Sequence, residues 1–308
     1  LGYLFFGFLS PFVGRISEKT GLKKVFISLC LTAALGSLAV AGSQGAVMYT
    51  LSRSLLGLTY FSLLGLLPSV VISYSQPHQV GKVSGIYKIV FASAIFMAPF
   101  TGVKLLERAG FKGIYLLLAA VFLILMCLFI LLPFKEKPLE RRKKGGGIED
   151  KKRVIPFMIS ALIFPVPIAL VMTYLGLYLA GKGVSQQEVG SMYSLMGSGS
   201  IAAGFIILFL SDRLGKSPMA LAGLLLVVLA LAGIMLPPLV LIVICGFLFY
   251  LGFDMFTGMF FPTVGMKFPR NSGVVLTRLT SANSAGMLLT TFLAPLIFSR
   301  GFIWNIAI

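Results

Sequence analysis

Nine apolar runs of about 20 residues each, separated by short polar breaks, constrain this chain more than any other feature. A helix of about 20 residues spans the hydrocarbon core of a bilayer, which is about 30 Å thick. The sequence of 308 residues is 58% hydrophobic and only 11% charged, so a water-soluble fold could not bury its apolar surface. We therefore expect an all-α membrane protein. The predicted spans are 25–43, 47–74, 83–106, 112–134, 154–180, 188–210, 218–236, 238–265 and 272–298.

Shorter apolar pieces stand at the two ends of the sequence, over 1–13 and from 301 onward. The chain begins with Leu1 instead of Met, and it lacks the basic segment that opens a signal peptide. We therefore expect both end pieces to be incomplete spans, and the sequence to be a fragment of a longer membrane protein.

The net charge of +17 is spread unevenly over the polar breaks. Of the 26 Lys and Arg residues, five lie in or at the edges of alternate breaks (Lys104, Arg108, Lys112, Lys182 and Arg300), three lie well inside spans, and the others share the remaining breaks. Basic loops stay in the cytoplasm, so the richer side is expected inside. This placement also argues against a nucleic-acid partner.

The longest polar segment, 135–153, is charged, interrupted by Gly and free of apolar periodicity. We expect it to be a flexible cytoplasmic linker between an N-terminal transmembrane bundle, 1–134, and a C-terminal one, 154–308. A basic patch for lipid headgroups or nucleic acid is the alternative interpretation of this segment.

A short polar stretch, Gly14–Lys24, recurs in degenerate form at Ser211–Ser217, which indicates two related halves. In both copies an acid is followed by a base, then by Gly and further bases. We expect Gly14 and Gly21 to permit a tight cytoplasmic turn, and the acid to accept hydrogen bonds from a helix N-terminus or to pair with an Arg in one conformation only. The candidate gating residues are Gly14, Glu18, Lys19, Gly21, Lys23 and Lys24, with Asp212, Arg213, Gly215 and Lys216 in the copy.

Four charged residues fall well inside predicted spans, away from the span ends: Arg53, Lys88, Asp254 and Arg278. Such a charge costs about 2.5–3.5 kcal/mol on insertion scales, so it usually faces a cavity or a partner. Asp254 is the only acid away from the ends of the predicted spans, and Gly252 and Gly258 thin the helix beside it. It either binds a proton or a cationic group, or forms a structural pair with a base on another helix.

The three bases have two interpretations each. Lys88 and Arg278 either snorkel to the inner interface or line the cavity, where they would favour anions or pair with Asp254. Arg53 either takes part in proton coupling or bonds to helix-end carbonyls.

Other polar residues in the spans are candidates for lining a substrate cavity. Ser194 and Ser198 share one helix face with Ser191, although small residues also serve close helix packing. Prolines at 156, 165 and 167 predict a kinked helix over 154–180. The candidate lining residues are Tyr174, Tyr178, Ser194, Ser198 and Asn283.

The stretch Gly14–Lys24 resembles the loop motif of the major facilitator superfamily, G-x-x-x-D-[RK]-x-G-[RK]-[RK], with Glu18 in place of Asp. In the second copy Leu208 stands where the leading Gly would be. Arg53 and Gly57 resemble the fourth-helix motif of the family. Pro99 and Gly102 resemble the exporters' helix-packing motif G-P-x-x-G, with Ala98 replacing the first Gly.

The resemblance implies two six-helix bundles related by a pseudo-two-fold repeat, of which this chain would cover about helices 2 to 12. It also implies a secondary transporter that works by alternating access, is similar to the drug and sugar exporters of the family, and gives Arg53 a role in proton coupling. Proton-coupled efflux of a small organic compound is the first expectation. Uptake of a small polar solute and a non-transporting receptor or scaffold are the alternatives.

Enzyme signatures are absent from the sequence. It has no Walker A motif, no H-E-x-x-H, and one His in all, His78 in a loop. The three Cys lie singly in apolar runs, without metal-ligand spacing. We expect no enzyme activity, cofactor or metal. The expected partners are a small-molecule substrate, protons and membrane lipids, for a monomer in the plasma (inner) membrane.

Overall fold

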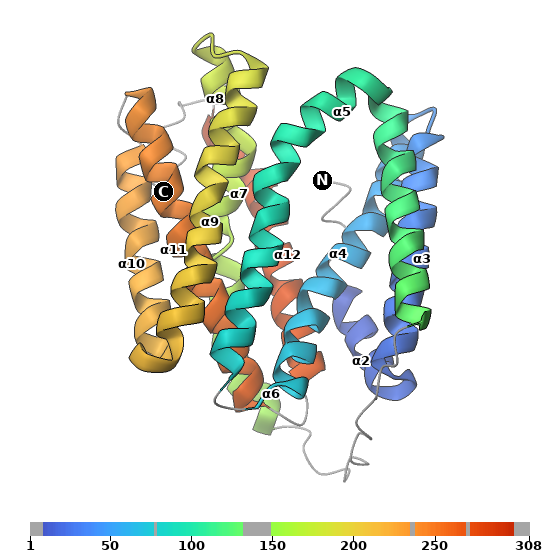
Figure 1. The fold of residues 1–308 in the computed structure, drawn as a ribbon, viewed down its shortest axis with the longest axis vertical. Coiled ribbons are helices and arrows are strands. Elements are labelled where there is room, and N and C mark those ends of the chain that lie inside the picture. Colours follow the sequence, from blue (N-terminus) through green and yellow to red (C-terminus); the bar gives the residue numbers. More distant parts are fainter. Residues whose placement is uncertain (1–8, 77–78, 132–148, 235–237, 269–271, 299–308) are drawn as a thin grey trace. The chain divides into compact units, whose positions relative to one another are not determined.

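The computed structural model describes residues 9–76, 79–131, 149–234, 238–268 and 272–298, and these are almost wholly helical (Figure 1). The N-terminal helices are α2 (Ser10–Thr20), α3 (Leu22–Ala41), α4 (Ala46–Tyr74) and α5 (Val80–Leu131). They are followed by α6 (Glu149–Ile163), α7 (Val166–Leu170), a π-helical turn (Val171–Leu175), α8 (Gly176–Gly181), α9 (Gln186–Leu214), α10 (Lys216–Ile234), α11 (Leu239–Lys267) and α12 (Ser272–Phe298).

Eight helical stretches within the described residues are long and apolar enough to cross a membrane. They overlap the first eight predicted whole spans one for one, since helix length and hydropathy are both set by local sequence. The largest difference is in α5, where the predicted spans 83–106 and 112–134 correspond to 80–99 and 101–131. The ninth predicted span, 272–298, is the continuous helix α12. The eight stretches are 22–41, 46–70, 80–99, 101–131, 153–181, 186–214, 216–234 and 239–267.

Two of the spans are interrupted. Gly110 has φ 64° and ψ −179°, a conformation open to glycine, and it breaks α5 within the stretch 101–131, between the predicted spans 83–106 and 112–134. The predicted kink over 154–180 is confirmed, because α6 ends at Ile163, just before Pro165. The π-helical turn at Val171–Leu175 follows in the same span and was not predicted.

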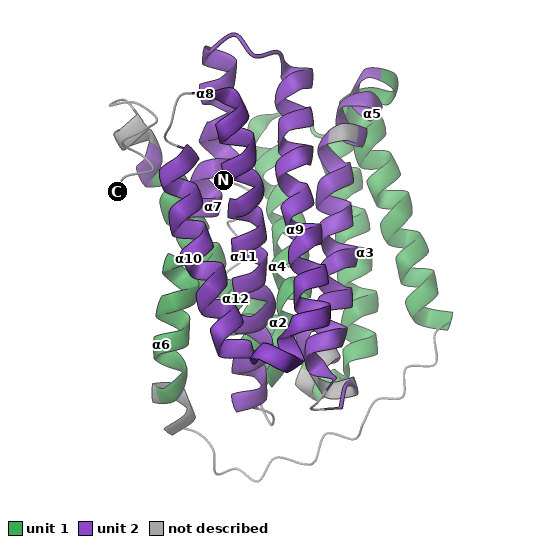
Figure 2. Ribbon diagram, turned by 60° about the vertical axis from the view of Figure 1, so that its left-hand side comes forward, with its two compact units in different colours: residues 1–67, 108–166, 270–292 green, residues 68–107, 167–269, 293–308 purple. Residues whose placement is uncertain are grey.

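The described chain divides into two compact units that interleave along the sequence (Figure 2). Unit 1 comprises 1–67, 108–166 and 270–292, and unit 2 comprises 68–107, 167–269 and 293–308. The bundles at 1–134 and 154–308 follow chain order instead, and they stay a prediction. Most of the linker 135–153, and His78, lie outside the described residues.

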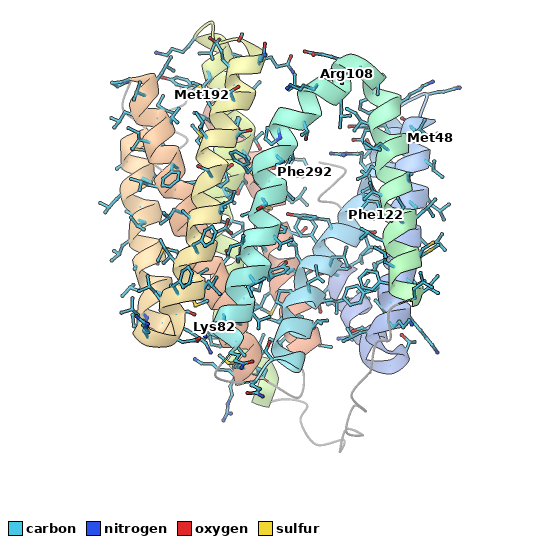
Figure 3. All side chains as sticks on the ribbon, viewed as in Figure 1. Met48, Lys82, Arg108, Phe122, Met192 and Phe292 are labelled. Atoms are coloured by element: carbon cyan, nitrogen blue, oxygen red, sulfur yellow. The ribbon has the colours of Figure 1, made fainter. Side chains whose placement is uncertain are left out.

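Unit 1 has a core cluster between α3, α4 and the second half of α5. Ala33 and Val40 of α3 and Leu56 of α4 are buried there with Tyr115. Phe122, labelled in Figure 3, packs against the same cluster from α5. The far face of this stretch of α5 carries exposed Leu, Ile and Val side chains, as a helix facing lipid would.

Unit 2 has its core between α9, α10 and α11, with Met255 and Met259 of α11 against Ala203 and Ile207 of α9. Glycines bring two of these helices together. A Cβ atom built on Gly223 of α10 would lie 2.6 Å from the carbonyl oxygen of Gly252 in α11. Small residues therefore set how closely the backbones pack, as is usual in membrane helices.

Candidate functional site

The two copies of the polar motif have the same backbone geometry, which supports the predicted repeat. Gly21 joins α2 to α3 with φ 93° and ψ 150°, and Gly215 joins α9 to α10 with φ 85° and ψ 154°. Each amide donates to a carbonyl four residues earlier, Gly21 to Ser17 at 3.0 Å and Gly215 to Ser211 at 3.2 Å. Both turns need positive φ, which glycine adopts without steric cost.

Gly14 does not form part of the turn, and that expectation was wrong. It is buried within α2, because the helix continues through the charged residues as far as Thr20. A Cβ on Gly14 would collide with Oγ1 of Thr277 in α12, and one on Gly65 of α4 would lie 2.9 Å from the Cα of Thr277. The Ser10 hydroxyl donates to the Thr277 carbonyl at 3.0 Å. Gly14 therefore permits close packing of α2 on α12.

The second copy makes the corresponding contact in unit 2 with the glycine on the other helix. Leu208 occupies the place of Gly14, and Gly85 of α5 packs against it. A Cβ on Gly85 would lie 2.7 Å from both the amide nitrogen and the Cα of Leu208. Asp212 lies at the first turn of α5, because a Cβ on Gly81 would come within 2.5 Å of its carboxylate. An acid at a helix N-terminus is stabilised by the helix dipole.

The bases of the motif divide into exposed and bonded groups. Lys23 donates to the carbonyl of Ile130 at 2.9 Å, near the C-terminal end of α5. Lys216 contacts the sulfur of Met266 at 3.3 Å. Lys19, Lys24 and Arg213 are exposed. The side chain of Glu18 lies outside the described residues, so its predicted partner stays a prediction.

Among the described residues of unit 2, an ion pair joins α5 to α11. The ammonium of Lys88 lies 2.5 Å from Oδ1 of Asp254 and donates to the Thr257 hydroxyl at 2.8 Å. That hydroxyl also donates to Oδ1 of Asp254, at 3.2 Å. The side chains of Lys88 and Asp254 are 11% and 6% exposed. The ion pair is therefore enclosed, and burial of this kind makes an unpaired charge costly.

Glycine explains how Lys88 comes so close to α11. A Cβ on Gly258 would lie 3.4 Å from Cγ of Lys88, and one on Gly204 of α9 would lie 2.9 Å from the backbone nitrogen of Ile89. Small residues on α9 and α11 thus leave room for α5. The predicted thinning of the helix around Asp254 is confirmed as close approach, while α11 stays helical throughout. Snorkelling of Lys88 was the wrong alternative, since its side chain is buried and paired.

Arg53 pairs within unit 1. Its guanidinium donates to the hydroxyl of Tyr115 at 2.7 Å and lies 5.9 Å from the centre of the same ring. Phe111 packs on Tyr115 at 4.8 Å between ring centroids. This contact links α4 to the second half of α5, and its role in proton coupling stays a prediction.

Arg278 lines a pocket of about 440 Å³ within unit 1. The walls come from Pro11 of α2, from Ile155 to Leu162 of α6, and from Arg278 to Ala285 of α12. Arg278 is the one charged residue among those that line it.

The remaining candidates are two Tyr residues in or near the π-helical turn and three small polar residues elsewhere. Tyr174 is buried in the π-helical turn, and Lys182 lies 5.3 Å from the ring centre of Tyr178. Ser198 donates to the Leu195 carbonyl, whereas the hydroxyl of Ser194 and Oδ1 of Asn283 are buried without a partner in the described residues. Their role as substrate-lining residues stays a prediction.

The residues of the two helix-packing motifs differ in their surroundings. Gly57 is buried in α4. The carbonyl of Pro99 lies 4.0 Å from a Cβ built on Gly190 of α9. No described atom lies within 4 Å of a Cβ built on Gly102. A packing role therefore stays a prediction for all three motif residues, Gly57, Pro99 and Gly102.

Sequence reasoning missed Tyr193. Its hydroxyl donates to the carbonyl of Val171 at 2.8 Å and accepts a hydrogen bond from the amide of Gly176 at 3.0 Å. These backbone groups stand at the start of the π-helical turn and just after it. Tyr193 therefore satisfies polar groups that the irregular helix exposes. The prolines before the turn signalled an irregular helix, but nothing in the sequence indicated its partner.

The Major Facilitator Superfamily model matches residues 1–291 of this chain. The multidrug resistance protein MdtG of Klebsiella pneumoniae (strain 342) is 24% identical over 243 residues, which is 74% of this chain and 58% of that protein. MdtG of Citrobacter koseri is 25% identical over 245 residues, or 74% and 59% of the two chains. The chain thus spans less than two thirds of the length of these relatives.

Solved structures with the same fold cover 99% of this chain. The human organic anion transporter MFSD10 has a TM-score of 0.79 at 16% identity, with 78% of its chain covered. The Escherichia coli fucose:proton symporter FucP has 0.79 at 13%, with 84% covered, and the proton:xylose symporter XylE has 0.80 at 13%, with 81% covered. These matches confirm the fold class predicted from the sequence.

Proposed function

The chain belongs to the major facilitator superfamily of membrane transporters, and from that premise we propose that it exports a small organic compound in exchange for protons. Transport proceeds by alternating access, in which the two halves rock and expose one site to each side in turn. The relatives at 24–25% identity are multidrug resistance proteins, which favours outward transport of an organic compound.

The buried pair of Lys88 and Asp254 is the observation that carries the proton coupling. While Asp254 is ionised, the pair is neutral overall and its charges satisfy each other. When a proton binds the carboxylate, the ammonium of Lys88 is left buried without its counter-charge. A buried charge whose partner is removed costs about 3–5 kcal/mol, so proton binding favours a conformation that rehydrates Lys88.

That free energy is large enough to drive a conformational change. A difference of about 3 kcal/mol changes a two-state equilibrium by more than 100-fold. Thr257 contributes by bonding to both charged groups, so it holds the ion pair in one geometry. Loss of the proton restores the pair and the closed packing of α5 on α11.

The polar motif supports a gating role at the ends of the same helices. Asp212 lies at the first turn of α5, the helix that carries Lys88. Movement of α5 therefore changes the distance between this carboxylate and the helix N-terminus. We assign Asp212 a gating role that couples the cytoplasmic end of α5 to the motif, and Glu18 the same role in the first copy.

Purified protein in liposomes with the internal pH dye pyranine tests this function. Anionic, cationic and neutral organic compounds are added in turn under an imposed pH gradient, and both proton and compound fluxes are measured. Efflux coupled to protons gives opposite signs for the two fluxes. Asp254→Asn is expected to lower the coupled flux at least 100-fold, while Asp212→Asn lowers the rate more than the affinity.

Glu107→Gln is the matched control, since Glu107 is an exposed acid on the same α5 as Lys88. Coupled transport that persists unchanged in Asp254→Asn would exclude the ion pair from the mechanism. Fluxes of the same sign would identify proton-driven uptake of a small solute, and no flux at all would favour a receptor or scaffold.

The same proposal carries the remaining expectations. The protein lies in the plasma (inner) membrane as a multi-pass monomer with the segment 135–153 in the cytoplasm. Its partners are the transported compound, protons and the surrounding lipids. Trypsin added to right-side-out and to inside-out vesicles tests on which side the segment 135–153 lies. A cytoplasmic segment is cleaved only in the inside-out vesicles.

A further inference from the structure

The pocket beside Arg278 has one charged group and mostly apolar walls. We propose that it binds a single-chain organic anion of the fatty-acid type, taken from the membrane, with the carboxylate on Arg278 and the chain along α6. This site is separate from the Lys88–Asp254 pair, which lies in the other unit. The proposal holds whatever compound the protein transports.

The charge of Arg278 is the first argument. No described acidic side chain pairs with it, and a lone charge at membrane depth is costly. The repeat shows which counter-charge is missing. Lys88 and Arg278 lie on corresponding helices, eight residues after the start of α5 and six after the start of α12. Lys88 obtains its counter-charge from Asp254 of α11. The corresponding helix α4, also of 29 residues, contains no acid, so a ligand is left to supply the anion.

The shape of the pocket is the second argument. Ile155, Met158, Ile159 and Leu162 are spaced at i, i+3, i+4 and i+7, so they form one apolar face of α6. Ala282 and Ala285 of α12 are also among the lining residues, and their small side chains leave room between the helices. At about 440 Å³ the pocket lies in the lower part of the range of about 300–1,000 Å³ for small-molecule sites. This size favours one hydrocarbon chain over the two of a phospholipid.

The third argument is the direction in which the pocket changes from charged to apolar, from the membrane surface inward. Arg278 lies six residues after the start of α12, which corresponds to about 9 Å of helix. Ala285 lies about 10 Å farther along the same helix. The loop before α12 belongs to the basic side of the chain, so the charged end lies nearer the inner surface and the apolar end lies deeper. A fatty-acid anion of the inner leaflet has the same order of charge and chain.

A photoreactive dodecanoate with a diazirine in its chain tests the proposal, with the protein in phosphatidylcholine nanodiscs. We expect cross-links on α6 between Ile155 and Leu162, located by mass spectrometry. Unlabelled dodecanoate is expected to compete, whereas dodecyltrimethylammonium and dodecanol do not. Equal competition by the cation or the alcohol would overturn the proposal, as would an absence of label on α6 because another segment occupies the pocket.

Variants test the charge of Arg278 and the shape of the pocket separately. Arg278→Gln is expected to lower labelling about tenfold or more, because a hydrogen bond between charged groups is lost, and Arg278→Lys retains most of it. Arg108→Gln removes an exposed Arg that does not line the pocket, and it is expected to leave labelling unchanged. Ala282→Phe keeps the charge and fills the pocket, so it blocks labelling and decides the matter if Arg278→Gln does not fold. Full labelling of either Arg278→Gln or Ala282→Phe would refute the site.

Discussion

The packing of α2 on α12 in unit 1 and of α5 on α9 in unit 2 solves one problem in two ways. In both, a motif helix approaches a neighbour closely enough that one partner must lack a side chain. Unit 1 places the glycine on the motif helix, at Gly14, against Thr277. Unit 2 places Leu208 on the motif helix and the glycine, Gly85, on the neighbour.

The difference shows that each contact has a glycine at the point of close approach, but that the glycine is on the motif helix in one unit and on the neighbouring helix in the other. A motif that lacks its leading glycine can therefore still be structurally complete. The charges follow the same principle. The base of unit 2, Lys88, has its acid on α11, whereas the base of unit 1, Arg278, lines a pocket. Similar backbones thus carry different electrostatics in the two units.

The largest expected effect on stability is the difference between removing Lys88 and removing Arg278. Lys88→Met leaves Asp254 buried without its counter-charge and is expected to destabilise the protein by about 3–5 kcal/mol. Arg278→Met is expected to leave the protein at least as stable, since it removes a lone charge and leaves no described partner behind. Thermal unfolding in detergent measures both. Stability should recover in the double variant Lys88→Met/Asp254→Leu; if it does not, Lys88 acts through packing instead of charge.

The next effect compares the two close helix contacts. Gly85→Ala forces a methyl group against the backbone of Leu208, so we expect a loss of about 2–3 kcal/mol. Gly14→Ala meets a side chain first, so the loss is expected to be smaller, about 1–2 kcal/mol. Thr277→Ala should rescue part of the Gly14→Ala defect, whereas Leu208→Ala should not rescue Gly85→Ala. The same unfolding measurement is made on both pairs of variants. Equal rescue in the two pairs would contradict the assignment of a side-chain contact to Gly14 and a backbone contact to Gly85.

The two turns should behave alike. Gly21→Ala and Gly215→Ala each place a methyl group at positive φ, with an expected cost of about 1–2 kcal/mol. Gly45→Ala is the control, because Gly45 does not have positive φ and no described atom lies within 4 Å of its Cβ position. A cost at one turn but not at the other would break the equivalence of the copies.

The smallest effect concerns the last base of each motif. Lys23 bonds to the carbonyl of Ile130, so Lys23→Met is expected to cost about 1 kcal/mol. Lys216 contacts the sulfur of Met266, a weak acceptor, and is attracted by the charge of Asp212, so Lys216→Met is expected to cost less than about 1 kcal/mol. Hydrogen exchange of the last turn of α5 measures the first effect locally. Exchange of the last turn of α11, which carries Met266, measures the Lys216 variant, and a larger acceleration there than in α5 of the Lys23 variant would reverse the assignment.

The sequence was sufficient for features that local physics determines. Span lengths follow from apolar runs, and the kink over 154–180 follows from its prolines. The repeated turn follows from Gly21 and Gly215, each preceded by an acid and a base. These properties depend on residues within one helix or one turn, so no knowledge of neighbouring helices was needed.

Features that depend on pairs of distant residues could not be predicted in the same way. Lys88 and Asp254 are 166 residues apart, and either could have met another partner. Gly14 stands in a helix because the break comes at Gly21, and its packing against Thr277 requires knowing which helix lies beside it. Tyr193 gave no signal, since its hydroxyl acts on the backbone of a different helix.

The bond from Tyr193 has a consequence for rotation. A π-helical turn contains an extra residue, so every side chain after it is rotated by about 100° from its place on a continuous α-helix. The Tyr193 hydroxyl bridges this turn from Val171 to Gly176. If the turn relaxed to α geometry, α8 would turn about its own axis and Tyr178 would face a different direction. The hydroxyl oxygen of Tyr193 on α9 therefore fixes the direction in which the side chains of α8 point.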